Sequence, residues 1–366
     1  MKVMIVSRAL LVRSYRGKLT ELARLGVRVT AVVPSEWREA GGPTCLEMDD
    51  QIGYELIQTS VRWAGHFHLH YYPELNRLLR DIRPDLLHLD EEPYNLSTYL
   101  GARAACGANV PSLFFSWQNL VRRYPPPFSG MERSVYRSVV HALAGTQEVA
   151  RVLRHKGYAG ALSVVPQFGV DPEMFRPGAY VESPFTIGFL NRLIPGKAPL
   201  MCVRALALLP KDTRLQIVGD GPLRKAVLAE IDRLALGERV SVEPRVPSAL
   251  VPEILRSLDA VVLPSVTTRR WKEQFGRIII EAMASGVPVV GSDSGEIPRV
   301  IGDGGLIVPE GDVRALARAL RQLYEDRDLG RRLGERGRRR VLEHFTHERV
   351  AELSRAAYER ALGGTY

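Results

Sequence analysis

Short apolar, β-rich runs alternate with amphipathic helical stripes through the first half of the chain, and this alternation constrains the fold more than any other feature. Each run has the length of a strand, and each stripe has the spacing of a helix with one buried face. The expected strands cover residues 3–6, 27–33, 85–89 and 111–115, and the expected helices cover residues 19–25, 75–82 and 96–105. Strand–helix alternation of this kind predicts a parallel sheet covered by helices on both faces.

The same alternation restarts after a segment rich in proline and glycine at residues 166–184, which is typical of a domain boundary. Further strands are expected at residues 185–189, 214–218, 240–242, 260–263, 288–291 and 305–308, with helices between them. We therefore predict an α/β protein of two doubly wound Rossmann-like domains facing a cleft, over residues 1–170 and 171–345. Residues 346–366 are expected to form a C-terminal helix that packs back on the first domain.

The net charge of +9 raises the question of an anionic partner. Residues 1–178 carry +4 and residues 179–366 carry +5, so neither half is a basic arm. Only residues 101–156 concentrate positive charge, at +6, which suits phosphate-bearing substrates or an anionic membrane surface. No apolar run reaches the length of a membrane span, and the three scattered cysteines indicate no disulfide framework. We expect a cytoplasmic chain with peripheral contact to the inner face of the membrane and no nucleic-acid partner.

The stretch Trp271–Pro288 is the most informative for function. Gly276 precedes an apolar helical run, so residues 274–277 are expected at a helix N-terminus, where backbone N–H groups and the helix dipole favour an anion. Glu273 lies just outside that end and Glu281 about one turn inside it. Carboxylates in these positions suit hydrogen bonds from sugar hydroxyls. The alternative is that Glu281 is a surface residue and that Glu273 only places a charge near the helix N-terminus.

A second basic element follows the strand at residues 185–189. Arg192 and Lys197 flank a Pro-Gly turn, so both side chains can converge on one point. An arginine fork together with a lysine point charge is typical of diphosphate recognition. Ordinary solvated loop residues are the alternative.

Taken together, these motifs resemble the retaining GT-B-fold glycosyltransferases of glycosyltransferase family 4. The resemblance is carried by Glu273 and Glu281 in an E-x7-E spacing and by Arg192 with Lys197. It also rests on Val218–Pro222, Val165–Asp171 and Gly305–Asp312, whose order and spacing match over residues 165–325. The resemblance implies transfer of a sugar from a UDP- or GDP-sugar to an acceptor hydroxyl, with retained anomeric configuration, in cell-surface glycan, glycolipid or polysaccharide synthesis.

The resemblance also implies roles for single residues. Glu273 would contact the donor sugar, Glu281 the nucleotide ribose, and Arg192 with Lys197 the donor diphosphate. Further donor contacts would come from Phe275, Gly276, Arg277, Arg245 and Val246. No metal and no cofactor are expected, because the basic pair takes the place of a metal ion.

The first domain departs from the family pattern at two places. Similar enzymes have a Gly-Gly loop after the first strand, whereas here only Gly17 is available for the donor phosphate. The family often places a histidine after a mid-domain strand, but residues 115–119 contain none, so Gln118 or Asn119 is expected to bind the acceptor instead. Arg122 and Arg123 follow and favour a small-molecule, glycan or lipid-linked acceptor that carries negative charge.

Two alternatives remain for the function, and two further patterns could indicate a metal site. The chain could be a non-catalytic nucleotide-sugar-binding protein or a GT-B-fold epimerase. His66, His68 and His70 alternate like metal ligands on one strand face, but the aromatic residues around them favour an ordinary loop. Asp326-Arg327-Asp328 matches the D-x-D pattern of another glycosyltransferase fold, yet it lies in a polar helical segment rather than after a strand.

Overall fold

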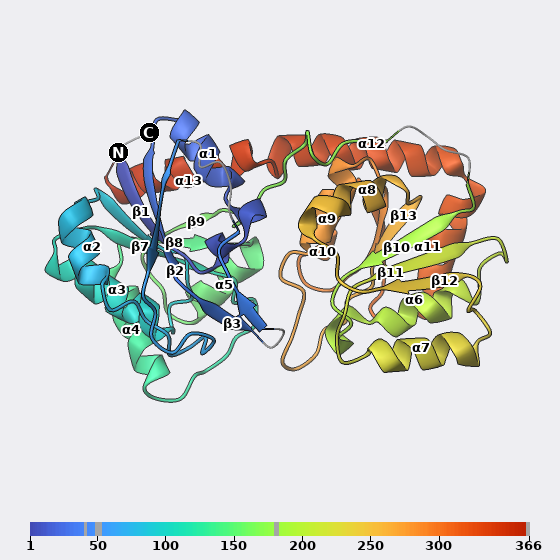
Figure 1. Ribbon diagram of the computed structural model, residues 1–366, viewed down its shortest axis with the longest axis horizontal. Coiled ribbons are helices and arrows are strands. Elements are labelled where there is room, and N and C mark those ends of the chain that lie inside the picture. The colour runs from blue at the N-terminus through green and yellow to red at the C-terminus, as the bar shows by residue number, and fades with distance from the viewer. Residues whose placement is uncertain (40–41, 48–52, 179–182, 364–366) are drawn as a thin grey trace. The chain divides into compact units, whose positions relative to one another are not determined.

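The computed structural model describes residues 1–39, 42–47, 53–178 and 183–363, and these form two compact units. Unit 1 holds residues 1–169 together with the chain from His347 onward, and unit 2 holds Val170–Thr346. Each unit is a parallel sheet covered by helices on both faces (Figure 1). The predicted pair of Rossmann-like domains is confirmed.

Unit 1 contains a seven-stranded sheet in the order β5-β2-β1-β6-β7-β8-β9. The strands are β1 (Lys2–Val6), β2 (Arg28–Pro34), β5 (Glu55–Thr59), β6 (Leu86–Leu89), β7 (Ser112–Ser116), β8 (His141–Ala144) and β9 (Ala161–Val164). The helices are α1 (Gly17–Arg24), α2 (Leu75–Ile82), α3 (Leu96–Gly107), α4 (Phe128–Ser138), α5 (Gln147–His155) and α13 (His347–Ala361). Two short strands, β3 (Trp37–Glu39) and β4 (Gly42–Thr44), pair antiparallel. The central strands β1 and β6 are almost wholly buried, and they are apolar except for Lys2 at the start of β1 and His88 in β6.

Unit 2 contains a six-stranded parallel sheet in the order β12-β11-β10-β13-β14-β15. The strands are β10 (Thr186–Leu190), β11 (Arg214–Val218), β12 (Val240–Glu243), β13 (Ala260–Leu263), β14 (Val289–Ser292) and β15 (Gly305–Val308). The helices are α6 (Pro199–Leu206), α7 (Arg224–Arg233), α8 (Val251–Arg256), α9 (Arg277–Ala284), α10 (Ile297–Ile301), α11 (Val313–Glu325) and α12 (Arg327–His344). The strand order reverses beside β10 and β13, and ligands of such sheets bind at the carboxyl ends of the strands near that point.

The last helix, α13, packs on α1 and closes the core of unit 1 (Figure 1), which confirms the predicted return of the C-terminal helix. Val350, Ala351 and Ala357 are fully buried in the cluster that also contains β1 residues. The Tyr358 hydroxyl and His88 Nδ1 share a hydrogen bond of 2.8 Å, which ties α13 to the centre of the sheet.

This link makes unit 1 sensitive to acid. Burial lowers the pKa of His88 from 6.5 to about 4. Between these values the unfolded chain binds a proton that the folded chain does not. The stabilisation from neutral His88 is therefore complete above pH 6.5 and is lost as the pH falls toward 4.

We expect the thermal midpoint of the wild-type protein to fall as the pH is lowered from 6.5 to 4. The midpoint of His88→Gln should fall less steeply over the same range. Calorimetry at a series of pH values measures both slopes. His344→Gln is the control, because His344 is exposed on α12. Equal slopes for His88→Gln and wild type would contradict the assignment.

Candidate functional site

Two loops lock together at the carboxyl ends of β10 and β11. Asn191 N–H donates to the Val218 carbonyl at 3.1 Å, and Leu193 N–H donates to the Asp220 carbonyl at 2.9 Å. A Cβ on Gly219 would lie 2.0 Å from the Asn191 carbonyl oxygen, so glycine is required for this close approach. The Gly219–Pro222 motif therefore fixes the backbone that carries Arg192.

The centre of the site is a buried ion pair between two residues far apart in the sequence. Lys197 ends a 3-10 turn, Pro195–Lys197, and its Nζ lies 2.5 Å from Glu273 Oε2. The Ser265 hydroxyl, just after β13, donates to the same carboxylate oxygen at 2.8 Å. Lys197 and Glu273 are 8% and 5% exposed, so water screens their attraction only weakly.

The backbone around Glu273 is held by a second close approach. Gly295, in the loop after β14, has a φ of +56°, and a Cβ there would lie 2.0 Å from the Glu273 carbonyl oxygen. The loops that follow β10 and β13 thus meet at the Glu273 carboxylate, and the loop after β14 packs against the Glu273 backbone. Because all three strands are parallel, their carboxyl ends lie at the same edge of the sheet.

Helix α9 begins beside this pair. Gly276 is its N-cap with a left-handed φ of +75°, and a Cβ there would collide with Leu263 at 2.6 Å. The Arg277 Nε donates to Glu281 Oε1 at 2.5 Å, so the buried carboxylate of Glu281 is already paired within the helix. Phe275 is buried and makes an edge contact with Phe345.

The remaining sequence-predicted residues of unit 2 lie on loops at the same edge of the sheet. Arg192 is exposed, and no hydrogen bond or ion pair of its side chain joins it to the part of the chain that the structure describes. Arg245 is exposed and Val246 half-buried in the loop after β12. Lys197 and Arg277 already pair with Glu273 and Glu281, so the exposed Arg192 adds positive charge at this edge, which suits an anion.

The predicted residues of unit 1 are more dispersed. Gly17 is the first residue of α1, and a Cβ there would lie 2.5 Å from the His347 imidazole, so contact with α13 by itself requires a glycine. Gln118 and Asn119 are buried after β7, and Gln118 Oε1 accepts from Lys156 Nζ at 2.9 Å. Arg122 and Arg123 are exposed in the following loop.

Comparison with known proteins decides the family. The model described as "Glycosyl transferases group 1" matches residues 170–340, and "Glycosyl transferase 4-like domain" matches residues 13–167. The chain belongs to the glycosyl transferases group 1 family. The two family models fall on the two units of the fold, and the first of them covers every site residue predicted in unit 2.

Within this family, the curated relatives act on different acceptors. The chain is 34% identical over 228 residues to "D-inositol 3-phosphate glycosyltransferase" of Nocardia farcinica, covering 56% of this chain and 49% of the relative. It is 36% identical over 149 residues to "N-acetyl-alpha-D-glucosaminyl L-malate synthase" of Bacillus anthracis, covering 40% of this chain and 37% of the relative. The matches therefore span about half the length of these relatives or less.

Solved structures share the fold at low identity. A glycosyltransferase from Rickettsia africae superposes with a TM-score of 0.78 at 19% identity, covering 100% of this chain and 99% of the other. Anabaena HepE in complex with UDP gives 0.76 at 18% identity, covering 98% and 100%. These likenesses show that this family member has the GT-B fold.

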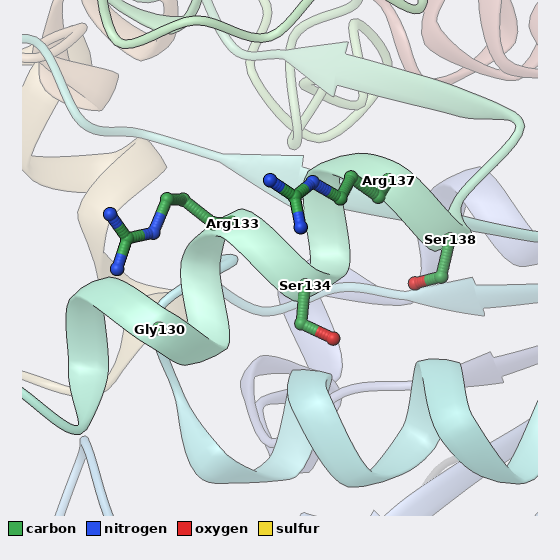
Figure 2. A pocket seen from close by; sticks show the side chains of 5 residues that line it. All are labelled: Gly130, Arg133, Ser134, Arg137 and Ser138. Carbon is green, nitrogen blue, oxygen red and sulfur yellow. The ribbon is translucent and has the colours of Figure 1, made fainter.

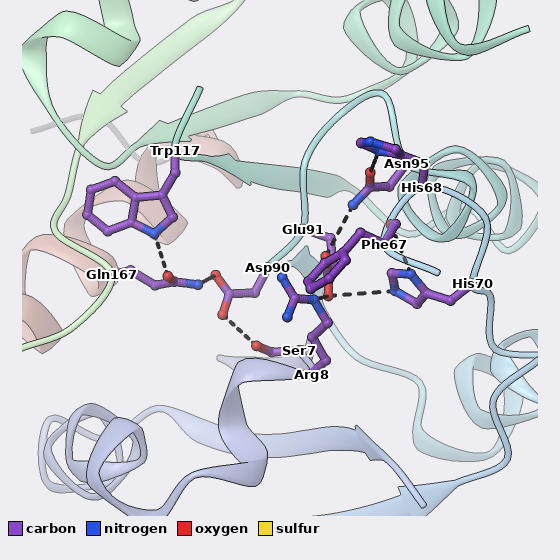
Figure 3. A network of polar contacts seen from close by, with 10 residues as sticks. All are labelled: Ser7, Arg8, Phe67, His68, His70, Asp90, Glu91, Asn95, Trp117 and Gln167. Atoms are coloured by element: carbon purple, nitrogen blue, oxygen red, sulfur yellow. Dashed lines mark hydrogen bonds and ion pairs between the residues drawn. The ribbon is translucent and has the colours of Figure 1, made fainter. Parts of the chain in front are cut away.

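Unit 1 of this family member also contains a buried polar network that was not predicted from the sequence (Figure 3). Asp90 Oδ2 accepts from the Ser7 hydroxyl at 2.7 Å, and Asp90 Oδ1 accepts from Gln167 Nε2 at 2.8 Å. Gln167 Oε1 in turn accepts from the Trp117 indole at 2.6 Å. One hydrogen-bonded chain thus joins the segments that follow β1, β6, β7 and β9.

The two acids after Asp90 also have polar partners. Glu91 faces Arg8 at 3.3 Å and His70 at 3.7 Å. Glu92 accepts from the Ser116 hydroxyl and the Trp117 N–H, both at 2.7 Å. Burial raises the pKa of Glu92 to about 7, although these hydrogen bonds oppose the shift. Three consecutive acids directly after a buried strand are the signal in the sequence that could have revealed this network.

The two alternative metal patterns have plain structural explanations. Residues 66–70 form turns rather than a strand, with His70 buried and His66 and His68 exposed, which confirms the loop interpretation. Asp326 caps the N-terminus of α12 by accepting from the Leu329 N–H at 2.8 Å. Among the described residues, no cluster of three or more His, Cys, Asp or Glu side chains could hold a metal ion.

Within the ranges that the structure covers, every helix is too short or too polar to cross a bilayer.

Proposed function

We propose that this chain is a retaining glycosyltransferase that moves a sugar from a UDP- or GDP-sugar to an acceptor hydroxyl, in glycan, glycolipid or polysaccharide synthesis. The observation that carries the proposal is the buried Lys197–Glu273 pair at the carboxyl edge of the second sheet, directly before the N-terminus of α9. Family membership supports it, and so do the relatives whose names include sugar-transferring activities.

Charge complementarity defines the role of each basic residue. Arg192 would bind the donor diphosphate through its guanidinium fork, and Lys197 would contact it while still paired with Glu273. As the bond to the sugar breaks, negative charge grows on the leaving phosphate, and fixed positive charge stabilises it most at that moment. The backbone N–H groups at the start of α9 add to the same field.

The carboxylates would hold the neutral parts of the donor. Glu273 is fixed by Lys197 and Ser265, so its carboxylate is oriented before the sugar arrives and accepts hydrogen bonds from sugar hydroxyls. Glu281 would accept from the ribose hydroxyls while Arg277 keeps its carboxylate in place.

The transfer step would occur on one face of the sugar. The bond between the anomeric carbon and the diphosphate oxygen breaks, and the acceptor oxygen forms its bond from the same side. The acceptor proton passes to the leaving phosphate oxygen, so no side-chain nucleophile is needed. The protein contributes positioning and electrostatic stabilisation.

A thermal-shift panel of UDP-, GDP- and ADP-sugars tests donor binding. We expect one UDP- or GDP-sugar to raise the thermal midpoint, since a ligand at about a hundred times its Kd adds about 2.7 kcal/mol of stability. Arg192→Gln should keep the unliganded midpoint, because Arg192 is exposed, and should lose most of the shift. A panel without any shift, or a full shift in Arg192→Gln, would contradict the proposal.

A further inference from the structure

The outward face of α4 in unit 1 carries a stripe of two arginines, two serines and one glycine. Their spacing of i, i+3, i+4, i+7 and i+8 places them along one side of the helix. Together they line a pocket of about 570 Å³, formed by Gly130, Arg133, Ser134, Arg137 and Ser138. Figure 2 shows Arg133 and Arg137 leaving successive turns and extending in the same direction, with the two serine side chains on the same helix.

The stripe is basic because the single acid of α4 points inward. Glu132 is buried, and its Oε1 accepts from Lys156 Nζ at 2.5 Å. Arg133 and Arg137 are exposed, and neither forms an ion pair or a side-chain hydrogen bond within the described ranges. Like charges at i and i+4 destabilise a helix by a few tenths of a kcal/mol. The adjacent arginines therefore lack a counter-charge from the residues described.

Gly130 keeps this pocket open without serving the packing of the helix. It is exposed, and a Cβ added there would meet nothing within 4 Å. A glycine within a helix costs roughly 0.8–1.0 kcal/mol relative to alanine. Neither packing nor a left-handed φ requires glycine at this position. The absent side chain leaves room beside Arg133.

We propose that this pocket binds a phosphate group, at a site distinct from the Lys197–Glu273 edge of unit 2. Two guanidinium groups can each offer paired N–H donors to phosphate oxygens, which is the geometry that arginine forms best. The Ser134 hydroxyl adds a donor, and the Ser138 hydroxyl, which donates to the Val135 carbonyl at 3.3 Å, can turn to add another. A phospholipid headgroup and a free phosphorylated compound share this chemistry.

Helix α11 of unit 2 provides a matched comparison. Arg314 and Arg318 are also exposed at i and i+4, but alanines follow them at 315 and 319 where α4 has Ser134 and Ser138. Replacing either arginine pair by glutamine removes the same charge at the same spacing. A difference between the two double variants therefore reports on the pocket rather than on net charge.

Backbone-amide NMR of the full chain, titrated with inorganic phosphate at constant ionic strength, tests the proposal. We expect saturable shifts at the amides of Gly130, Ser134 and Ser138. Arg133→Gln/Arg137→Gln should weaken the apparent affinity at least about tenfold, because both charged donors are lost. Gly130→Leu should weaken it as well, by filling the pocket without changing charge. Arg314→Gln/Arg318→Gln should leave it unchanged.

Two results would contradict phosphate binding in this pocket. One is the absence of a saturable shift at these amides, and the other is an equal loss of phosphate affinity in the α4 and α11 double variants. Co-sedimentation with phosphatidylcholine vesicles, with and without phosphatidylglycerol, then identifies the source. Binding to the anionic vesicles that Gly130→Leu abolishes assigns a lipid headgroup, and phosphate binding without vesicle binding assigns a free phosphorylated compound. The α4 variants should keep the nucleotide-sugar thermal shift, so failure of this pocket and failure of the proposed donor site are distinguishable.

Discussion

Glu273→Gln is expected to lower the rate of sugar transfer at least about a hundredfold, equivalent to some 2.7 kcal/mol of transition-state stabilisation. The amide keeps the size of the side chain but removes the charge that Lys197 and Ser265 hold in place. Lys197→Met should lower the rate to a similar extent, because it removes the cation paired with that carboxylate. Initial rates of nucleotide diphosphate release measure both variants.

The double variant Lys197→Met/Glu273→Gln should regain stability without regaining activity. Breaking a buried ion pair on one side costs about 3–5 kcal/mol, because the other charge is left buried without a partner. Lys197→Met/Glu273→Gln removes both charges and should therefore unfold at a higher denaturant concentration than either single variant. It should nevertheless stay as inactive as they are.

Arg327→Gln is the control for this series. It breaks the 2.6 Å pair with Asp259, which precedes β13 at the opposite edge of the same sheet, and should leave the transfer rate close to wild type. Recovery of transfer in the Lys197→Met/Glu273→Gln variant would show that the pair has only a structural role.

Gly295→Ala is expected to have the second large effect, on stability and on rate together. The new Cβ would lie 2.0 Å from the Glu273 carbonyl oxygen at a φ of +56°, so the backbone carrying Glu273 must move. We expect a loss of at least about 2 kcal/mol in the free energy of unfolding, since glycine replacements at incompatible sites exceed the usual range. A shift of about 1 Å at a positioning residue can cost a hundredfold in rate.

Gly311→Ala is the control that introduces backbone strain without a steric contact like that between Gly295 and Glu273. Gly311 has a φ of +77°, but a Cβ there would meet nothing within 4 Å. It should cost only about 1–2 kcal/mol, the price of a left-handed alanine, and leave the rate intact. Urea denaturation and initial rates measure both variants. Equal losses for Gly295→Ala and Gly311→Ala would contradict the link between Gly295 and Glu273.

Much of the fold follows from local pattern. Residues 3–6 and 260–263 are unbroken apolar runs, and residues 86–89 are apolar except for His88, because central strands of a parallel sheet are buried on both faces; these strands were predicted. Two other strands carried weaker signals. β5 is a partly exposed edge strand, and the small residues of β8, His141–Ala144, have little strand propensity.

The residues of the proposed donor site were predicted from the sequence, but the contacts between them were not. Arg192, Lys197, Glu273 and Glu281 stand in motifs that their neighbours in sequence reveal. The Lys197–Glu273 pair joins residues 76 apart, and it depends on how the loops after β10 and β13 pack. That packing is set by close approaches such as Gly295 to Glu273, which a single sequence does not encode locally.

The polar network of unit 1 was even less predictable from the sequence, because its partners come from separate segments. Asp90 is surrounded by Ser7, Gln167 and Lys18 from three other segments. Burial opposes ionisation of Asp90, yet Lys18 and its hydrogen-bond donors together lower its pKa. Each partner is an ordinary polar residue in the sequence, and only the parallel sheet brings them to one edge.

Sugar transfer by this protein is tested most directly by the rate at which nucleotide diphosphate is released from the sugar nucleotide that stabilises the wild-type protein most. The assay combines that donor with a panel of glycan, lipid-linked and phosphorylated acceptors and compares wild type with Arg192→Gln. We expect acceptor-dependent release by wild type and release at least about a hundredfold slower in the variant, with its fold intact. A donor that binds but is never cleaved, or equal rates in the two proteins, would contradict it.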